Sequence, residues 1–257
     1  MSIHTLLDPK AGITLPPGLC ALGVMTKAPE AGKVKTRLTP PLTPEEAAQL
    51  NTKFLRDISR SISLACGQSA SRGVAIYTPV GAEASYKGIL PADFFLLPQR
   101  GDLFGERLLF AAEDLFQVGF ESVCLINSDS PTVPPASFIE AANKLAKSGD
   151  RTVIGPAADG GYYLIGLKKL HRRLFEEIDW STERVFEQTR QRASEIGIEV
   201  HELSRGLDVD DAATLCDLCQ ELFGRDTRST KDVAPETRRF LSAIIEREGH
   251  ERIWPKM

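Results

Sequence analysis

The sequence predicts an α/β fold in which helices flank a parallel-type sheet. Short apolar runs alternate with segments of helical periodicity along the chain, as expected when strands and helices alternate. The run at 122–126 is apolar after Ser122, which is typical of a central strand buried on both faces. The length of 257 residues can bury a sizeable core and favours one domain over two.

The expected elements follow from local signals. Residues 19–25 form an apolar run that we expect to be a buried strand. A helix is expected to begin at Thr43, because Thr43 can cap it, Pro44 suits its first turn and Glu46 completes a capping box. The further expected strands are 73–78, 94–97, 122–126, 152–155, 162–167 and 198–203. The further expected helices are 102–118, 135–147, 181–196, 211–222 and 235–248.

The composition narrows the classes of partner. The net charge is −4 and the basic residues are spread along the chain, so we expect no nucleic-acid partner. No apolar run approaches the length of a membrane span, and residues 1–18 lack the pattern of a signal peptide. We therefore expect a cytoplasmic protein without a membrane partner. We also expect residues 1–18 and 225–231 to be mobile.

The most informative segment is the basic loop at residues 27–38, which directly follows the strand expected at 19–25. Ligands of open α/β sheets bind at the carboxyl ends of strands, and cations with a glycine suit phosphate. The loop therefore predicts an anionic ligand, most simply a nucleotide. Its candidate phosphate-binding residues are Lys27, Gly32, Lys33, Lys35 and Arg37.

Two acidic segments are candidates for a divalent cation. Asp129 follows the most apolar strand, where it either ligates a metal such as Mg²⁺ or serves as a turn or helix cap before Pro131. In the segment 206–211, Asp208 and Asp210 would face the same side of an extended chain. Asp211 fits the alternative interpretation of a helix N-terminus, where aspartate is favoured.

Two weaker segments also follow or flank expected strands. Asp159 could hydrogen-bond a substrate hydroxyl or act as a base, with Gly160 and Gly161 forming a wall close to a ligand; alternatively, the segment is a hairpin turn. Gln99 and Arg107 could contact a base, sugar or phosphate, or could only cap and solvate the helix that follows them.

Taken together, these segments resemble a known family. The pattern is K-A-P-x-x-G-x-V-K-T-R-L, then N-S-D-S-P, D-G-G-Y-Y-L-I-G-L, I-D-W-S-T and a late D-x-D, and it covers roughly residues 19–222. It is similar to the GT-A-type glycosyltransferase-like, or nucleotide-diphospho-sugar transferase-like, family, an uncharacterised family in which some members are labelled arsenosugar-biosynthesis glycosyltransferases. The resemblance implies a GT-A-like mixed, mostly parallel sheet with helices on both faces and a nucleotide over its first half. It makes 19–222 the nucleotide-binding transferase domain and 223–257 a C-terminal helical extension of that domain.

The resemblance also implies roles for individual residues. Lys33, Lys35 and Arg37 would meet the donor phosphates, Asp129 stands where such folds place a metal-binding aspartate, and Asp210 resembles the late metal-binding aspartate of sugar-activating nucleotidyltransferases. Two features depart from the pattern. The segment S-D-S offers one aspartate where a glycosyltransferase carries D-x-D, and the loop lacks the G-x-G-x-R of a nucleotidyltransferase. The family therefore lies between two reaction classes.

The sequence hypothesis is a metal-dependent transferase with a nucleotide-activated donor, most simply a nucleotide-diphospho-sugar, and an acceptor of unknown identity. Mg²⁺ or Mn²⁺ would be held by Asp129 and Asp210, while Lys35 and Asp159 would act with Asp129 in catalysis and Asp208 would contact substrate. One alternative is a nucleotidyltransferase that joins a nucleoside triphosphate to a small phosphorylated acceptor and releases pyrophosphate. Another is a nucleotide-binding module without catalysis.

Overall fold

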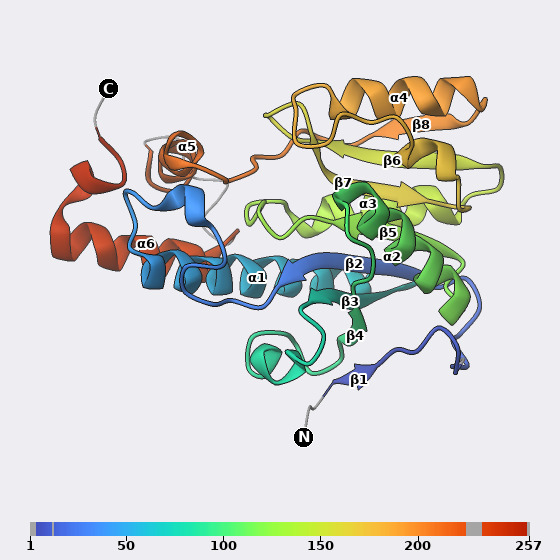
Figure 1. The fold of residues 1–257 in the computed structure, drawn as a ribbon, viewed down its shortest axis with the longest axis horizontal. Helices are drawn as coiled ribbons and strands as arrows, with labels where there is room; N and C mark the ends of the chain where they lie inside the picture. Colours follow the sequence, from blue (N-terminus) through green and yellow to red (C-terminus); the bar gives the residue numbers. More distant parts are fainter. Residues whose placement is uncertain (1–3, 12, 225–232, 256–257) are drawn as a thin grey trace.

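An eight-stranded sheet forms the centre of the molecule (Figure 1). The computed structural model describes residues 4–11, 13–224 and 233–255. The strand order is β1-β4-β3-β2-β5-β7-β6-β8, and all pairs are parallel except those of β7, which runs antiparallel to β5 and β6. The predicted mixed, mostly parallel sheet is therefore confirmed. The strands are β1 (Thr5–Leu6), β2 (Cys20–Lys27), β3 (Ser71–Thr78), β4 (Phe95–Pro98), β5 (Ser122–Ile126), β6 (Arg151–Pro156), β7 (Tyr162–Leu167) and β8 (Glu199–Glu202).

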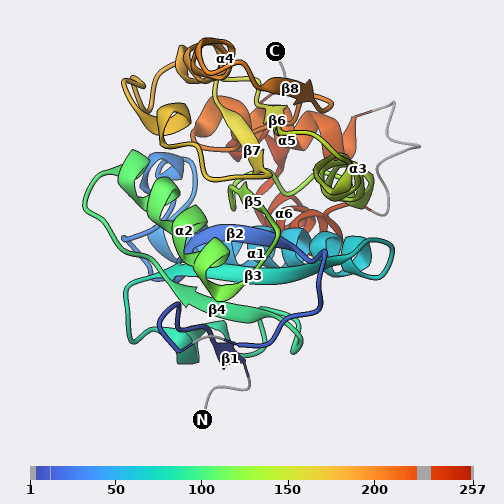
Figure 2. The ribbon, with the colours of Figure 1, turned by 90° about the vertical axis from the view of Figure 1, so that its right-hand side faces the viewer.

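Helices cover both faces of the sheet, as predicted (Figure 2). α1 (Pro44–Cys66) and α3 (Pro135–Ala146) share a buried apolar cluster with one face, while α2 (Phe104–Val118) and α4 (Val185–Glu195) pack on the other. The capping box predicted at the start of α1 is present: Glu46 N donates to Thr43 Oγ1 at 3.1 Å and Thr43 N donates to Glu46 Oε2 at 3.0 Å. Short 3₁₀ helices complete the described elements at Thr36–Leu38, Glu83–Tyr86, Arg172–Phe175 and His250–Arg252.

A third apolar core lies beside the sheet and positions part of the site. It forms where α5 (Ala212–Phe223) and α6 (Pro235–Glu248) pack against the N-terminal half of α1. Buried Asp57 of α1 ties α6 down by accepting hydrogen bonds from Glu236 N at 3.0 Å and Thr237 N at 2.8 Å. Val209 is fully buried in the same core, which anchors the acidic segment around it.

The structure differs from the sequence expectations in two places. The expectation that residues 1–18 are mobile is wrong for β1, because it pairs with β4, and the following Leu7 is 1 % exposed. The other segment expected to be mobile, 225–231, lies outside the described residues. The helix expected from residue 181 begins only at Val185, because Ser181 takes a left-handed conformation with φ of 63°. None of the described helices is both long and apolar enough to cross a bilayer.

Candidate functional site

The sheet brings the basic loop and the first acidic segment to one edge. β2 and β5 are parallel neighbours, so the segments that leave their carboxyl ends lie side by side. The second acidic segment leaves β8, which is an edge strand of the sheet, and reaches the same carboxyl ends on its way to α5. It is held there by a backbone hydrogen bond from Val209 N to Asp129 O at 3.0 Å. Segments far apart in the sequence thus meet at the carboxyl ends of the central strands β2 and β5.

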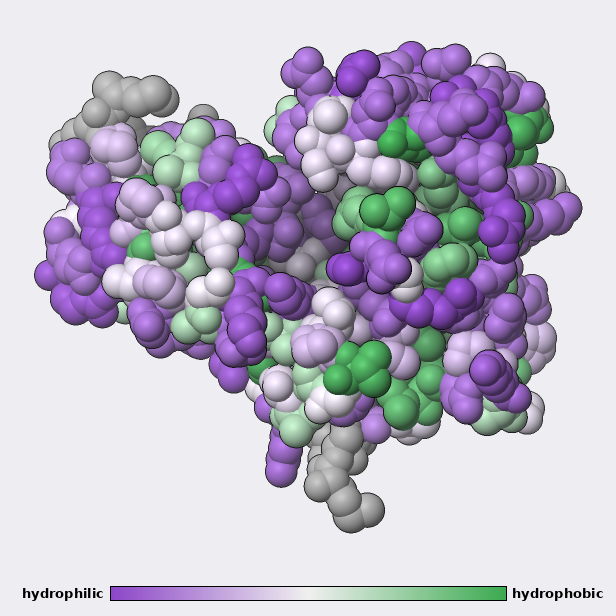
Figure 3. Space-filling model, viewed as in Figure 1, coloured by the Kyte–Doolittle hydropathy of each residue, from purple (hydrophilic) through white to green (hydrophobic). Residues whose placement is uncertain are grey.

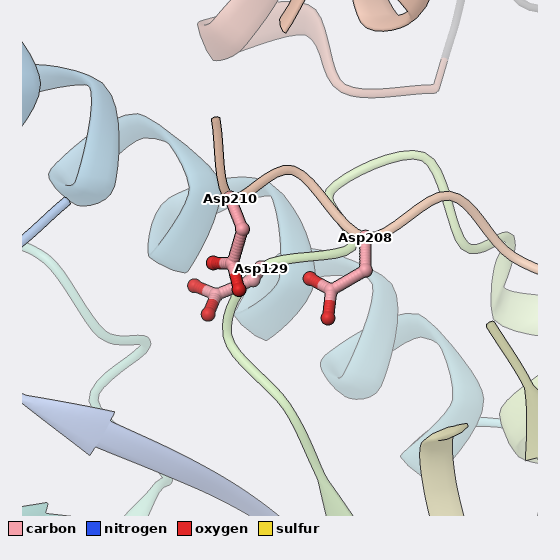
Figure 4. Close-up of side chains that lie close together, drawn as sticks. All are labelled: Asp129, Asp208 and Asp210. Atoms are coloured by element: carbon pink, nitrogen blue, oxygen red, sulfur yellow. The ribbon is translucent and has the colours of Figure 1, made fainter. Parts of the chain in front are cut away.

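Three carboxylates converge at this meeting point (Figure 4). One oxygen each of Asp129, Asp208 and Asp210 lies within 4.8 Å of the other two. Asp208 and Asp210 contribute from the same side of the extended segment, because the intervening Val209 turns into the third core. Asp211, by contrast, accepts from Thr214 N at 3.0 Å and caps α5, which agrees with its alternative interpretation.

Lys35 lies among these carboxylates. Its side chain is 5 % exposed, and Nζ lies 2.8 Å from Asp129 Oδ1 and 3.0 Å from Asp210 Oδ1. Nζ also donates to the carbonyl oxygen of Val209 at 2.6 Å. Burial alone would lower the pKa of Lys35, but the charges of Asp129 and Asp210 outweigh burial and raise it. The ammonium is therefore a fixed positive charge at neutral pH.

Asp208 shows that the cluster has an excess of negative charge. Its Oδ1 is buried and has no hydrogen-bond partner among the described residues. Burial, with added repulsion from Asp129 and Asp210, raises the pKa of Asp208 to about 8. Three carboxylates face one ammonium, and oxygen ligands of this kind suit Mg²⁺ or Mn²⁺. The residues present therefore fit the divalent cation that the sequence predicts.

Two cavities adjoin at the carboxylates. The smaller one, about 250 Å³, is lined by Lys27, Lys33, Lys35 and Arg37, and we call it the basic hollow. The larger one, about 500 Å³, we call the acidic cavity; its acidic lining residues are Asp129, Asp159, Glu183, Asp208, Asp210 and Asp211. Arg37, Ser128, Asp129 and Asp210 line both cavities. The surface is hollowed here, between the part built by α5 and α6 and the part built by β6, β8 and α4 (Figure 3).

The basic hollow is made mainly by the loop that the sequence singled out. Lys33 is 60 % exposed and forms an ion pair with Glu30 at 2.8 Å, while Arg37 is 71 % exposed and lies 3.9 Å from Asp210. Gly32, with φ of +74°, turns the exposed part of this loop. Exposed Lys33 and Arg37 can move to meet an anionic ligand, whereas Lys35 is held in place.

The acidic cavity is half polar and half apolar. Asp159 is exposed and accepts a hydrogen bond from Gly161 N at 3.0 Å, and its negative charge adds to the raised pKa of Asp208. The same lining also contains apolar and aromatic side chains, among them Phe104, Leu108 and Trp180. Sequence reasoning did not select Phe104, Trp180 or Glu183. The only signal for Trp180 was its place in the I-D-W-S-T segment of the resemblance.

Four residues with predicted ligand roles lie outside the lining of both cavities: Gly32, Gln99, Arg107 and Gly160. Gln99 Nε2 donates to the carbonyl oxygens of Thr26 and Ile76, at 3.2 and 2.7 Å. Arg107 Nε donates to Gly101 O at 3.1 Å. A Cβ atom on Gly160 would lie 2.2 Å from the carbonyl oxygen of Glu183, so this glycine permits close packing of that loop. Their ligand contacts stay predictions.

Comparisons with known proteins support the family and the fold. The family model described as "Uncharacterized protein conserved in bacteria" (DUF2064) matches residues 63–182. The structure is similar to that of a "putative nucleotide-diphospho-sugar transferase" from Desulfovibrio desulfuricans G20, with 28% identity and a TM-score of 0.77, covering 90% of this chain and 98% of that one. These two findings support the predicted GT-A-like, nucleotide-diphospho-sugar transferase-like family.

Two further solved structures match at lower similarity. A cytidylyltransferase from Leptospira borgpetersenii serovar Hardjo-bovis shares 12% identity with a TM-score of 0.49, covering 93% of this chain and 98% of that one. A nucleotidyl transferase from Methanothermobacter thermautotroptrophicus shares 14% identity with a TM-score of 0.49, covering 72% of this chain and 86% of that one. A search of curated proteins found no match.

Proposed function

We propose that this protein is a metal-dependent transferase that moves a glycosyl group from a nucleotide-diphospho-sugar to a small acceptor. The observation that carries the proposal is the convergence of Asp129, Asp208 and Asp210 at the boundary between a basic and an acidic cavity. The similarity to the Desulfovibrio desulfuricans G20 protein supports the same class of donor.

In this proposal the basic hollow binds the diphosphate of the donor. Lys27, Lys33 and Arg37 neutralise the phosphate oxygens, and the buried ammonium of Lys35 offsets the charge that develops on the leaving diphosphate. Mg²⁺ or Mn²⁺, held by Asp129 and Asp210 with Asp208 beside them, would supply Lewis-acid stabilisation of the leaving group.

The acidic cavity then holds the transferred sugar and the acceptor. Asp159 is the proposed base, because it is an exposed carboxylate in the lining of this cavity. The acceptor oxygen bonds to the anomeric carbon, the bond from that carbon to the diphosphate breaks, and the hydroxyl proton passes to Asp159. The products are a glycosylated acceptor and a nucleoside diphosphate.

A second candidate is nucleotidyl transfer, in which the acceptor attacks the α-phosphorus of a nucleoside triphosphate and pyrophosphate leaves. One observation favours it. A single aspartate follows β5, and its acidic partners come from the late segment 208–210, which is the arrangement that the sequence resemblance connects with sugar-activating nucleotidyltransferases.

Calorimetry with UDP, GDP, CDP and ADP, each with and without Mn²⁺ or Mg²⁺, tests the shared premise of both candidates. We expect at least one nucleotide to bind, more tightly with metal. Absence of nucleotide binding under all these conditions would contradict the proposal. Release of a nucleoside diphosphate then supports glycosyl transfer, whereas pyrophosphate release supports the second candidate. Nucleotide binding without either product would indicate a non-catalytic module.

A further inference from the structure

The two adjoining cavities differ in charge in a way that bears on the acceptor. Among the described residues that line the acidic cavity, Arg37 is the sole cation, and it stands at the boundary with the basic hollow. The other charged lining residues are all carboxylates. An anionic ligand in this cavity would meet like charges with little compensation, whereas a neutral or cationic ligand would not.

The apolar side of the same cavity offers an aromatic surface. The rings of Phe104 and Trp180 pack edge to face, with centroids 5.4 Å apart and an interplanar angle of 74°. Phe104 is 54 % exposed even though it is a large apolar side chain. Such a surface can pack against a ring or an apolar face of a ligand.

Close backbone packing sets the position of this surface. A Cβ atom on Gly105 would lie 2.3 Å from Trp180 Nε1, so only glycine leaves room for the indole against the first turn of α2. On the other side of the loop, Phe186 N donates to Gly160 O at 2.9 Å, and Gly160 packs against the backbone of Glu183. The segment 180–186 therefore contacts α2 through Trp180 and the turn that carries Asp159 through Glu183 and Phe186.

We propose that the acidic cavity selects a small, neutral or cationic acceptor whose ring or apolar face packs on Phe104 and Trp180, with its hydroxyl group toward Asp159. The inference rests on the proposed function only in treating the ligand as the acceptor of the transfer. The charge selectivity of the cavity depends on the residues that line it. The cavity volume of about 500 Å³ suits a small molecule. An acceptor that carries a phosphate group is disfavoured.

Intrinsic fluorescence can test this selectivity without turnover. The chain has two tryptophans, so a Trp254→Phe variant leaves Trp180 as the single reporter. Three matched phenols serve as probes: tyramine, which is cationic; 4-hydroxyphenylethanol, which is neutral; and 4-hydroxyphenylacetate, which is anionic. We expect tyramine and 4-hydroxyphenylethanol to change the fluorescence of Trp180 saturably. We expect 4-hydroxyphenylacetate to bind at least about tenfold more weakly.

A Trp180→Leu variant, compared with Trp254→Phe, checks the position of the probe. We expect calorimetry to show at least fivefold weaker tyramine binding in Trp180→Leu alone, with circular dichroism and thermal unfolding confirming that both variants fold. Equal affinities for tyramine and 4-hydroxyphenylacetate would overturn the inference. So would unchanged tyramine binding by Trp180→Leu, or no binding of any of the three probes.

The failure of this inference can be told apart from failure of the proposed function. Probe binding needs neither nucleotide nor metal, while the proposed function is tested by nucleotide binding in the basic hollow and by product release. Charge-selective probe binding without nucleotide binding would support the inferred selectivity of the acidic cavity and contradict the proposed transferase function. Nucleotide turnover without charge-selective probe binding would support the proposed function and contradict the inferred selectivity of the acidic cavity.

Discussion

The basic hollow and the acidic cavity share a wall but are built in different ways. The cations of the basic hollow lie between Lys27, the last residue of β2, and Arg37, within one short stretch of chain. The carboxylates of the acidic cavity come from the segments after β5 and β6, the segment before α4 and the segment before α5. One side of this site is therefore encoded by a short stretch of chain, whereas the other side forms only when distant segments fold together. This arrangement also places Asp129 and Asp210 at the boundary, where the reacting bond would lie.

The greatest loss of activity is expected from a substitution at Asp129, which lies where the two cavities meet. Asp129→Asn removes a carboxylate that lines both cavities and contacts Lys35. We expect metal-dependent transfer to fall by about 10²-fold or more, because the developing charge on the diphosphate loses stabilisation. The measurement is kcat/KM together with a Mn²⁺ titration. Asp217→Asn, an exposed substitution on α5, is the control and should retain full activity.

Lys35→Met should be the next largest perturbation, and it acts on stability. The substitution leaves Asp129 and Asp210 facing each other without the buried ammonium. We expect the free energy of unfolding to fall by about 2 kcal/mol without metal, less than for a fully buried pair because the carboxylates are partly exposed. Urea unfolding measures it. Lys33→Met, on the exposed side of the same loop, should change stability by less than about 0.5 kcal/mol; equal losses would contradict the difference between the two lysines.

Asp208→Asn should stabilise the metal-free protein by about 1 kcal/mol near pH 8, because it removes a partly buried charge of which Oδ1 has no hydrogen-bond partner among the described residues. The folded pKa of Asp208, about 8, lies above its unfolded value, so the wild-type stability gained from this proton is lost as pH rises toward 8. The difference in melting temperature between variant and wild type should therefore grow from pH 5 to pH 8. Mn²⁺ should reduce this difference, and a difference that is constant over this pH range would refute the assignment.

The smallest expected effect separates the two cavities. Lys33→Ala should weaken nucleoside diphosphate binding about threefold, because its charge is exposed and screened by solvent. The effect should shrink further in high salt. Tyramine binding in the acidic cavity should not change, and calorimetry on the same sample measures both ligands. Parallel losses of both ligands would show that the cavities are not independent.

The locally encoded parts of the fold and site were the ones predictable from the sequence. The capping box at Thr43, the cap at Asp211 and the basic loop each depend on neighbouring residues. The shared side of Asp208 and Asp210 followed from strand alternation alone. The alternating pattern of apolar runs and helices predicted a parallel-type sheet with flanking helices, whereas the mixed character of the sheet was implied by the family resemblance.

The rest depended on contacts between distant segments. Exposed Phe104 and the indole of Trp180 become a surface only because Gly105 lets them meet, and no periodicity carries that information. The helix expected from Ser181 starts later because Ser181 takes a left-handed conformation, and the following Glu183 packs against Gly160 of a distant turn. The sequence did not predict the pairing of Thr5–Leu6 with β4, because two residues are too few to show a strand pattern.

The contact between Lys35 and Asp210 joins residues that are 175 positions apart. A growing polypeptide thus exposes its cationic turn long before the opposing acidic groups are synthesised. The convergence of these acidic groups depends on Val209, which is buried in the third core and whose N donates a hydrogen bond to Asp129 O. The proposed capture of metal and nucleotide would therefore require that residues 208–210 are synthesised and folded against the rest of the site.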